Sequence, residues 1–294
     1  MLFDEVVFLY VEAKQFGRKP LRPNTLEGYM SAICCHLMPR WSGREIESIT
    51  HDEIQAWVDG FELPGAAEKA YKTLRQIVRW HLKAHDVRIW DETQGIELPA
   101  RRRRRPNALT AKEAKSALRD MRGEEWETAA LVQLSCGLRP CEAIALTWAD
   151  VNLSNGELSV TKGLHEAGGD VYESPTKTEK SSRIVILPRY AVERLREIRR
   201  EKGARRNERL CAMKPSSYRR RVRSWFARRG QRMCSQWLRH TWGTLALQAG
   251  VALETVSLML GHSSISTAYE HYLMTNTALM RDAQREFSAL ISGA

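Results

Sequence analysis

Apolar residues recur at spacings of three and four along most of the chain, which is the pattern of helices with one buried face. Over the first hundred residues this pattern predicts four helices, one of which begins at the capping box Thr50-His51-Asp52-Glu53. The other three are expected at residues 2–14, 25–37 and 66–84. We therefore expect this part of the chain to fold as a small helical domain.

The helix expected at 66–84 carries two neighbouring stripes at helical spacing. Its apolar stripe consists of Tyr71, Leu74, Val78 and Leu82. Its basic stripe consists of Lys72, Arg75, Arg79 and Lys83. The apolar stripe should face a core, whereas the basic stripe fits a solvated surface and a ligand-binding face equally well.

The second part of the chain is also mainly helical, but its pattern changes between residues 151 and 187. Residues 158–161 and 184–187 have the β-branched and apolar composition of strands, and several glycines lie between them. We expect two or three short antiparallel strands here. Helices are expected at 111–121, 125–137, 189–202, 216–228, 237–249, 252–260 and 264–273, followed by a segment at 276–292 that could pack on its own domain or on a neighbouring subunit.

A polybasic segment separates the two parts. Two prolines, Pro99 and Pro106, bracket five consecutive arginines. Like charges repel and proline resists helix formation, so residues 99–108 are expected to form an extended linker between domains at 1–98 and 109–294. The arginines are also well suited to neutralising phosphates: Arg101, Arg102, Arg103, Arg104 and Arg105.

The charge of the chain is distributed unevenly. There are 46 Lys and Arg against 35 Asp and Glu, a formal net charge of +11. Residues 1–100 hold 12 basic and 15 acidic groups, so all of the excess lies in the remainder. This asymmetry points to a polyanionic partner, usually nucleic acid, although an ordinary solvated basic surface is the alternative.

Composition limits the class of protein. Hydrophobic residues make up 43% and charged residues 28%, an ordinary globular composition that excludes wholesale disorder. Without a membrane-length apolar run or a basic secretory start, we expect a soluble cytoplasmic protein with no membrane partner. None of the six cysteines forms a CxxC pair, so no zinc site is expected, and Cys34 and Cys35 are expected to be small core residues.

Four short segments carry most of the candidate chemistry. They are Gly137-Leu138-Arg139-Pro140-Cys141-Glu142, Pro175-Thr176-Lys177-Thr178, Leu238-Arg239-His240-Thr241, and the run from Leu260 to Thr267 followed by Tyr272. Two arginine forks could neutralise a pentacoordinate phosphate, a tyrosine hydroxyl could attack phosphorus, and a lysine could protonate the leaving oxygen. The segments bring no acidic cluster of metal-binding form, which disfavours metal-assisted phosphoryl transfer.

In this order, the four segments resemble those of tyrosine recombinases of the phage-integrase and Xer type, and the resemblance covers the whole chain. It implies a mainly α fold, with a helical core-binding domain followed by a mixed α/β catalytic domain that holds a small antiparallel sheet. Such a protein forms a C-shaped clamp around double-stranded DNA. The chain is similar to the short members of the family, which lack an arm-binding domain.

The resemblance also implies the role of each site residue. Arg139 and Arg239 would grip the scissile phosphate, and His262 would donate a hydrogen bond to it. Lys177 would protonate the departing 5′-oxygen. Tyr272 would be the nucleophile that forms a 3′-phosphotyrosine bond. The family needs no metal and no cofactor for this chemistry, and it usually works as a homotetramer on two DNA duplexes.

Some positions leave alternatives open. Gln236 stands where the family usually has histidine, and glutamine can donate a hydrogen bond but cannot take up a proton. Lys180 is a second candidate for the general acid, and Tyr269 a second candidate for the nucleophile. Glu142 is the implied structural partner of Arg139. A DNA-binding homologue that no longer cleaves, and a DNA-relaxing enzyme of type IB topoisomerase chemistry, are the alternative functions.

Overall fold

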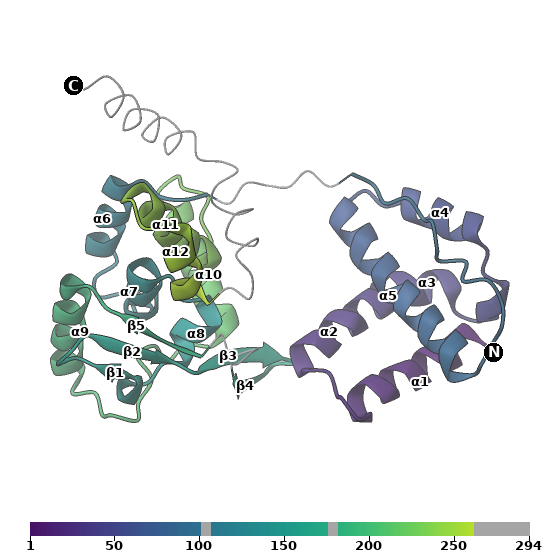
Figure 1. Cartoon of the computed structure of the whole chain (residues 1–294), viewed down its shortest axis with the longest axis horizontal. Coiled ribbons are helices and arrows are strands. Elements are labelled where there is room, and N and C mark those ends of the chain that lie inside the picture. Colours follow the sequence, from purple (N-terminus) through teal and green to yellow (C-terminus); the bar gives the residue numbers. More distant parts are fainter. Residues whose placement is uncertain (101–106, 176–181, 262–294) are drawn as a thin grey trace, which may run out of the picture. The chain divides into compact units, whose positions relative to one another are not determined.

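The computed structural model describes residues 1–100, 107–175 and 182–261. The chain divides into two compact units, Met1–Arg104 and Arg105–Ala294 (Figure 1). The predicted fold class is confirmed, because the described residues are mainly helical and the second unit adds small antiparallel sheets. In these ranges no helix combines the length and the apolar character needed to cross a lipid bilayer.

The first unit consists of helices packed around one core. Its helices are α1 (Phe3–Phe16), α2 (Pro23–Ala32), α3 (Met38–Trp41), α4 (His51–Asp59) and α5 (Pro64–Ala84), with a π-helical turn at Ile33–Leu37 and a 3-10 turn at Ile46–Ser48. The predicted capping box begins α4, where Thr50 accepts a hydrogen bond from the backbone of Glu53. Helix α5 packs against α1, α2 and α4, and its predicted apolar stripe is buried except for the partly exposed Leu82.

The prediction that Cys34 and Cys35 fill the core was wrong. Both cysteines are exposed. They lie in the π-helical turn, in which Ile33 and Leu37 are buried and the two cysteines between them face outward. Two apolar residues four positions apart are enough to fill the core side of one helical turn, so their neighbours are left on its outer side.

The helices of the second unit follow the predicted boundaries closely. They are α6 (Ala111–Asp120), α7 (Glu127–Cys136), α8 (Pro140–Ala145), α9 (Arg189–Lys202), α10 (Pro215–Ala227), α11 (Ser235–Gln248) and α12 (Leu253–Leu260). Among the described α-helices of this unit, α8 alone was not predicted, because its six residues are too few to display helical periodicity. The helix expected at 264–273 and the segment 276–292 lie outside the described residues.

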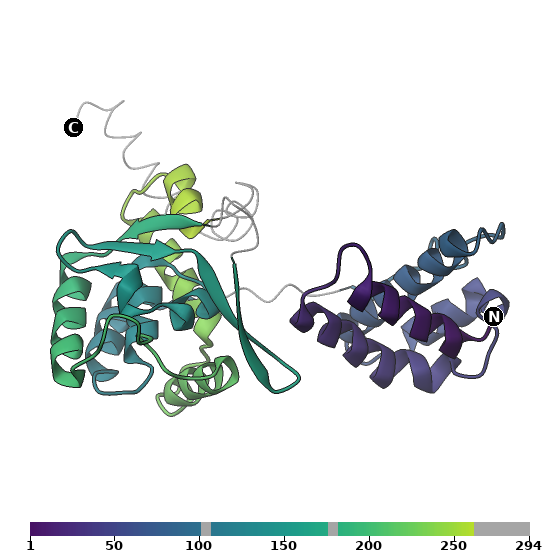
Figure 2. The same ribbon diagram turned by 90° about the horizontal axis from the view of Figure 1, so that it is seen from below.

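The second unit holds more strands than the two or three predicted. Strands β1 (Val151–Asn152), β2 (Glu157–Val160) and β5 (Arg183–Ile186) form one antiparallel sheet in the order β1-β2-β5. Strands β3 (Lys162–Ala167) and β4 (Asp170–Pro175) form a separate hairpin, which reaches out from the body of this unit (Figure 2). Its two-residue turn, Gly168-Gly169, has φ values of 59° and 88°, which favour glycine at both positions.

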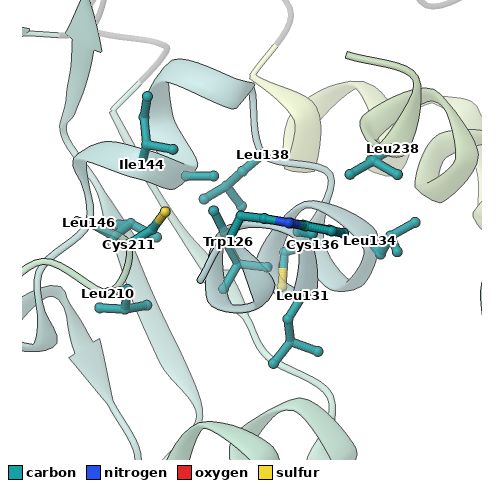
Figure 3. Close-up of a cluster of buried hydrophobic side chains, with 14 of the residues drawn as sticks. Trp126, Leu131, Leu134, Cys136, Leu138, Ile144, Leu146, Leu210, Cys211 and Leu238 are labelled. Atoms are coloured by element: carbon teal, nitrogen blue, oxygen red, sulfur yellow. The ribbon is translucent and has the colours of Figure 1, made fainter. Parts of the chain in front are cut away.

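Helix α7 lies at the centre of the second unit. All ten of its residues are buried, and α8, α9 and α11 pack around it. Figure 3 shows Trp126, Leu131 and Leu134 of this region beside Leu138, Ile144 and Leu238 from the neighbouring segments. The turn that follows α7 carries the first of the candidate site residues.

Candidate functional site

A tight turn between α7 and α8 positions Arg139. Gly137 ends α7 in the left-handed conformation, and Pro140 begins α8, which leaves Arg139 as the N-cap residue of α8. The backbone N–H of Arg139 donates to Glu142 Oε2 at 2.9 Å, and its Nη1 donates to Glu142 Oε1 at 2.7 Å. The Arg139 side chain stays 32% exposed, whereas the Glu142 side chain is 4% exposed. Arg139 can therefore still reach a ligand.

Gly137 is required at this turn for two reasons. Its φ is +69°, a value that costs an L side chain about 1–2 kcal/mol. A Cβ atom at this position would also lie 2.6 Å from Trp242 Cε3 and 2.6 Å from Leu260 Cδ2. The close approach of α11 and α12 to this turn therefore depends on the missing side chain.

We expect Gly137→Ala to lower the free energy of unfolding by the backbone cost together with about 1–3 kcal/mol for overpacking. Gly203→Ala is the matched control, because Gly203 also ends a helix with positive φ, at +57°, but no atom of the described residues lies within 4 Å of the added Cβ. Urea-induced unfolding of the full chain measures both variants. Equal destabilisation of the two would contradict the packing argument.

Arg239 approaches the same place from α11, one hundred positions later in the sequence. Its side chain is 3% exposed. Nη1 donates to the Gly137 carbonyl at 3.0 Å and Nη2 to the Leu260 carbonyl at 2.9 Å. Nη1 also lies 4.0 Å from Glu142 Oε2. The structure thus brings Arg139 and Arg239 together around one buried carboxylate.

A third arginine, Arg183, completes the group and was missed by the sequence analysis. It is the first residue of β5, and its Nη2 donates to Glu142 Oε2 at 2.9 Å. Its Nε donates to the Met259 carbonyl at 2.7 Å. The only local signal is its place at the start of a strand, which gives no indication of a buried ion pair. We call Arg139, Glu142, Arg183 and Arg239 the arginine cluster.

The carboxylate of Glu142 is held in its charged form. Burial raises the pKa of Glu142, but the hydrogen bonds and charge of Arg183 and the charge of Arg139 outweigh burial and keep this pKa below its ordinary value. With one carboxylate and three guanidinium groups, the arginine cluster carries a net positive charge. An anionic ligand would be attracted to it. Within the described residues, no group of three His, Cys, Asp or Glu side chains could hold a metal ion.

The end of α12 is bound to the arginine cluster through three consecutive carbonyl groups. The carbonyls of Met259, Leu260 and Gly261 accept hydrogen bonds from Arg183, Arg239 and Arg139, respectively. The carboxyl end of a helix carries a partial negative charge, so it is a suitable partner for guanidinium groups. The last described residues before His262 are thereby fixed beside the arginine cluster.

A buried amide fixes the distance between the turn that carries Arg139 and the start of α11. Gln133 of α7 donates through Nε2 to the Leu138 carbonyl at 3.0 Å and to the Ser235 carbonyl at 3.2 Å. Its Oε1 accepts from the hydroxyl of the buried Tyr218 on α10. One side chain therefore links the residue before Arg139 to the first residue of α11. Gln236, the next residue, is exposed on the first turn of α11.

Several predicted site residues lie outside the described residues. They are Lys177, Lys180, His262, Tyr269 and Tyr272. In the sequence, Lys177 and Lys180 lie between two described strands. Strand β4 ends at Pro175, and β5 begins at Arg183, which belongs to the arginine cluster.

The predicted basic stripe of α5 is largely accessible. Lys72, Arg79 and Lys83 are exposed, and Arg75 is partly buried. Lys72 pairs with Glu68 at 2.5 Å and Arg79 lies 3.8 Å from Asp91. The Lys72–Glu68 pair is partly exposed and contributes little, so Lys72 can exchange partners, whereas the Asp91 carboxylate beside Arg79 is only 10% exposed. The arginines of the predicted linker, residues 101–105, lie outside the described residues.

Helix α10 presents a second basic face, which the sequence analysis did not include among the site residues. Its buried side includes Trp225 and Phe226, which contact each other edge to face. At the start of the helix, Glu166 of the β3–β4 hairpin accepts hydrogen bonds from the backbone and hydroxyl of Ser216. The exposed residues in and just after α10 include six arginines: Arg219, Arg220, Arg221, Arg223, Arg228 and Arg229.

Comparisons with known proteins give a consistent result. Residues 107–278 match the model of the Phage integrase family. The chain is 25% identical over 295 residues to an integrase of Mycobacterium phage D29, covering 94% of this chain and 77% of that protein. It is 35% identical over 160 residues to the tyrosine recombinase XerC of Chlorobaculum parvum, covering 48% of this chain and 43% of that protein.

Solved structures share the fold. The Tn1549 transposon integrase in complex with transposon right end DNA gives a TM-score of 0.78 at 18% identity, covering 97% of this chain and 99% of that chain. A lambda integrase tetramer bound to a Holliday junction gives a TM-score of 0.68 at 18% identity, covering 92% of this chain and 77% of that chain.

Proposed function

Because this chain belongs to the phage integrase family, a family of tyrosine recombinases, we propose that it cleaves and rejoins DNA at specific sites through a 3′-phosphotyrosine intermediate. The observation that carries the proposal is the arginine cluster. Two arginines from distant parts of the sequence meet at one buried carboxylate, and one of them remains partly exposed. This arrangement suits the capture of a single phosphate group.

The arginines act on the charge that develops at phosphorus. When an oxygen attacks the phosphodiester, negative charge accumulates on the two non-bridging oxygens of the pentacoordinate phosphorus. The guanidinium groups of Arg139 and Arg239 stabilise that charge through planar, bidentate hydrogen bonds. Because the arginines are already fixed by Glu142 and by backbone carbonyls, little reorganisation is needed when the reaction occurs.

The other steps fall to residues from the family pattern. The hydroxyl of Tyr272 attacks phosphorus, the bond to the 5′-oxygen breaks, and the DNA strand becomes linked to the tyrosine through its 3′-phosphate. Lys177 gives a proton to the departing 5′-oxygen, and His262 donates a hydrogen bond to the phosphate. Ligation reverses the step, with a 5′-hydroxyl of the partner duplex as the attacking group. The match to the family, over 107–278, includes all of these positions.

Gln236 limits the proton-transfer chemistry that is available on the first turn of α11. Its exposed amide can donate a hydrogen bond to a phosphate oxygen but cannot accept a proton from the attacking tyrosine. The base that takes up this proton is therefore water or another side chain. This departure also favours the second candidate function, a DNA-binding homologue that does not cleave.

A covalent-trapping experiment decides between the two functions. The DNA site is first selected from a random pool of duplexes by binding to the full chain. A selected duplex with a nick near the cleaved phosphate then loses its short 5′-hydroxyl fragment, which traps the covalent adduct. An adduct that survives denaturing electrophoresis supports cleavage, whereas tight binding without an adduct supports the non-cleaving alternative. Relaxation of a plasmid that lacks the selected site would instead indicate topoisomerase activity.

The basic faces of α5 and α10, with the polybasic segment, are proposed to bind the DNA backbone. Lysine and arginine side chains displace counterions from DNA, so affinity should fall steeply with salt. The lambda integrase tetramer on a Holliday junction supports a tetrameric assembly on two duplexes for this chain as well.

Replacing Lys72 and Arg79 together by glutamine should weaken duplex binding. The slope of log affinity against log salt should become shallower by about 2, because each lost phosphate contact removes about 0.9. Fluorescence anisotropy with a labelled duplex at several salt concentrations measures this slope. The matched control is the double variant Arg18→Gln with Lys19→Gln, which removes the same charge from exposed positions of the first unit. Equal slopes for the two double variants would contradict the assignment of the α5 stripe.

A further inference from the structure

The side chain of Arg183 is held by several hydrogen bonds within the arginine cluster. Its side chain is 8% exposed. Nη2 and Nη1 donate to the two carboxylate oxygens of Glu142, at 2.9 and 3.3 Å, and Nε donates to the Met259 carbonyl at 2.7 Å. The guanidinium group thus binds Glu142 as a fork and uses its remaining edge on the end of α12.

The pairing with Glu142 determines how much positive charge the cluster can offer to a phosphate. A buried carboxylate requires a compensating charge. If Arg183 did not supply it, Glu142 would be neutralised by Arg139 and Arg239 alone, and their attraction for an anionic ligand would fall. Arg183 therefore supplies the charge that lets the other two arginines act on the phosphate.

The contact of Arg183 with the end of α12 fixes the position of Gly261, the last residue before His262. Gly261 ends α12 with φ of +65°, and a Cβ there would lie 3.2 Å from Arg183 Nη1. The guanidinium group lies directly against this glycine, and the next residue is His262. In the sequence, Lys177 belongs to the range 176–181, and Arg183 follows the end of that range by two positions. It pairs with Val160 in the antiparallel register of β2 and β5.

We propose that Arg183 is a positioning residue for DNA cleavage: it neutralises Glu142 so that Arg139 and Arg239 are available to the phosphate, and it anchors the end of α12 beside them. It acts through these groups and does not itself touch the scissile phosphate. The inference rests on the proposed function for its effect on cleavage, whereas the anchoring of α12 can be measured without DNA.

The test compares Arg183→Gln and Arg183→Lys with the wild-type full chain and with Arg189→Gln. Arg189 is a suitable control because its side chain is 92% exposed and, among the described residues, pairs at the surface with Glu193. Three quantities are measured: the rate of adduct formation with the nicked duplex, the affinity for that duplex, and hydrogen–deuterium exchange of the amides of α12. The rates are determined in single-turnover reactions with excess protein.

We expect Arg183→Gln to slow adduct formation about 10- to 100-fold, the effect known for losing a residue that orients a metal ligand, with affinity changed less than about 3-fold. Arg183→Lys keeps the charge but not the fork, so its rate should be intermediate. Adding Glu142→Gln to Arg183→Gln should restore part of the rate, because it removes the carboxylate that would otherwise neutralise Arg139 and Arg239. A loss of fold stability alone would lower affinity and rate together, and would not depend on this charge balance.

Two results would overturn the proposal. One is an Arg183→Gln rate equal to that of the wild type and of Arg189→Gln. The other is unchanged exchange in α12, which would show that Arg183 does not anchor the helix. If the wild type itself forms no adduct, the proposed function fails, and the exchange measurement alone decides the anchoring role: faster exchange in Arg183→Gln but not in Arg189→Gln supports it.

Discussion

Replacing Tyr272 by phenylalanine should eliminate the covalent adduct with a nicked duplex while DNA affinity stays within about 2-fold of the wild type. The substitution removes one oxygen atom, which is the nucleophile in the proposed reaction. Deletion of a nucleophile in other enzymes lowers the rate on the order of 10⁶-fold, so no adduct should be detectable. Denaturing electrophoresis of the labelled DNA measures the adduct, and anisotropy measures the affinity.

Tyr269→Phe is the matched control for this experiment. It makes the same chemical change three positions earlier in the sequence. We expect it to keep the adduct, because the distance in sequence from His262 to Tyr272 fits the family pattern better. An adduct that persists in Tyr272→Phe and disappears in Tyr269→Phe would transfer the nucleophile role to Tyr269.

Replacing Arg239 by lysine should slow adduct formation on the order of 10²- to 10³-fold, the cost of removing one fixed donor from a developing negative charge. Lysine keeps the positive charge but lacks the planar fork that now reaches Gly137 and Leu260. Duplex affinity should change little, because most of it comes from the exposed basic faces. The measurement is a single-turnover rate at saturating protein.

The control for Arg239→Lys is Arg200→Lys, the same change at an exposed position of α9. Arg239→Ala is a less informative variant, since it would leave buried carbonyl groups without a donor and destabilise the fold. Thermal unfolding of both lysine variants shows whether the fold is intact. A rate for Arg239→Lys equal to that of Arg200→Lys would remove Arg239 from the proposed mechanism.

The helices could be predicted because local signals specify them. Thr50 and Thr110 begin helices through capping boxes, and Gly137 ends one, so these boundaries agree with the structure to within a residue or two. The β3–β4 hairpin could not be predicted in the same way. Its strands are only partly buried, so no strict alternation of apolar and polar residues marks them.

The candidate site was predictable only in part. The motifs that contain Arg139 and Arg239 stand out in the sequence, and the structure brings these two residues together. Arg183 has no such motif, because its importance arises from tertiary contacts with Glu142 and α12. The same limit explains the wrong prediction for Cys34 and Cys35. Their side chains point outward because their neighbours in the turn, Ile33 and Leu37, are the residues that pack into the core.

Each of the three carbonyl groups at the end of α12 binds a different arginine, so the number of residues in this helix is critical for protein engineering. A helix rotates by about 100° for each residue, so one residue inserted within α12 would turn Met259, Leu260 and Gly261 away from all three arginines at once. Insertions into this unit are better tolerated in exposed turns, such as residues 205–207 after α9. Fusion tags and reporter loops should therefore be introduced there.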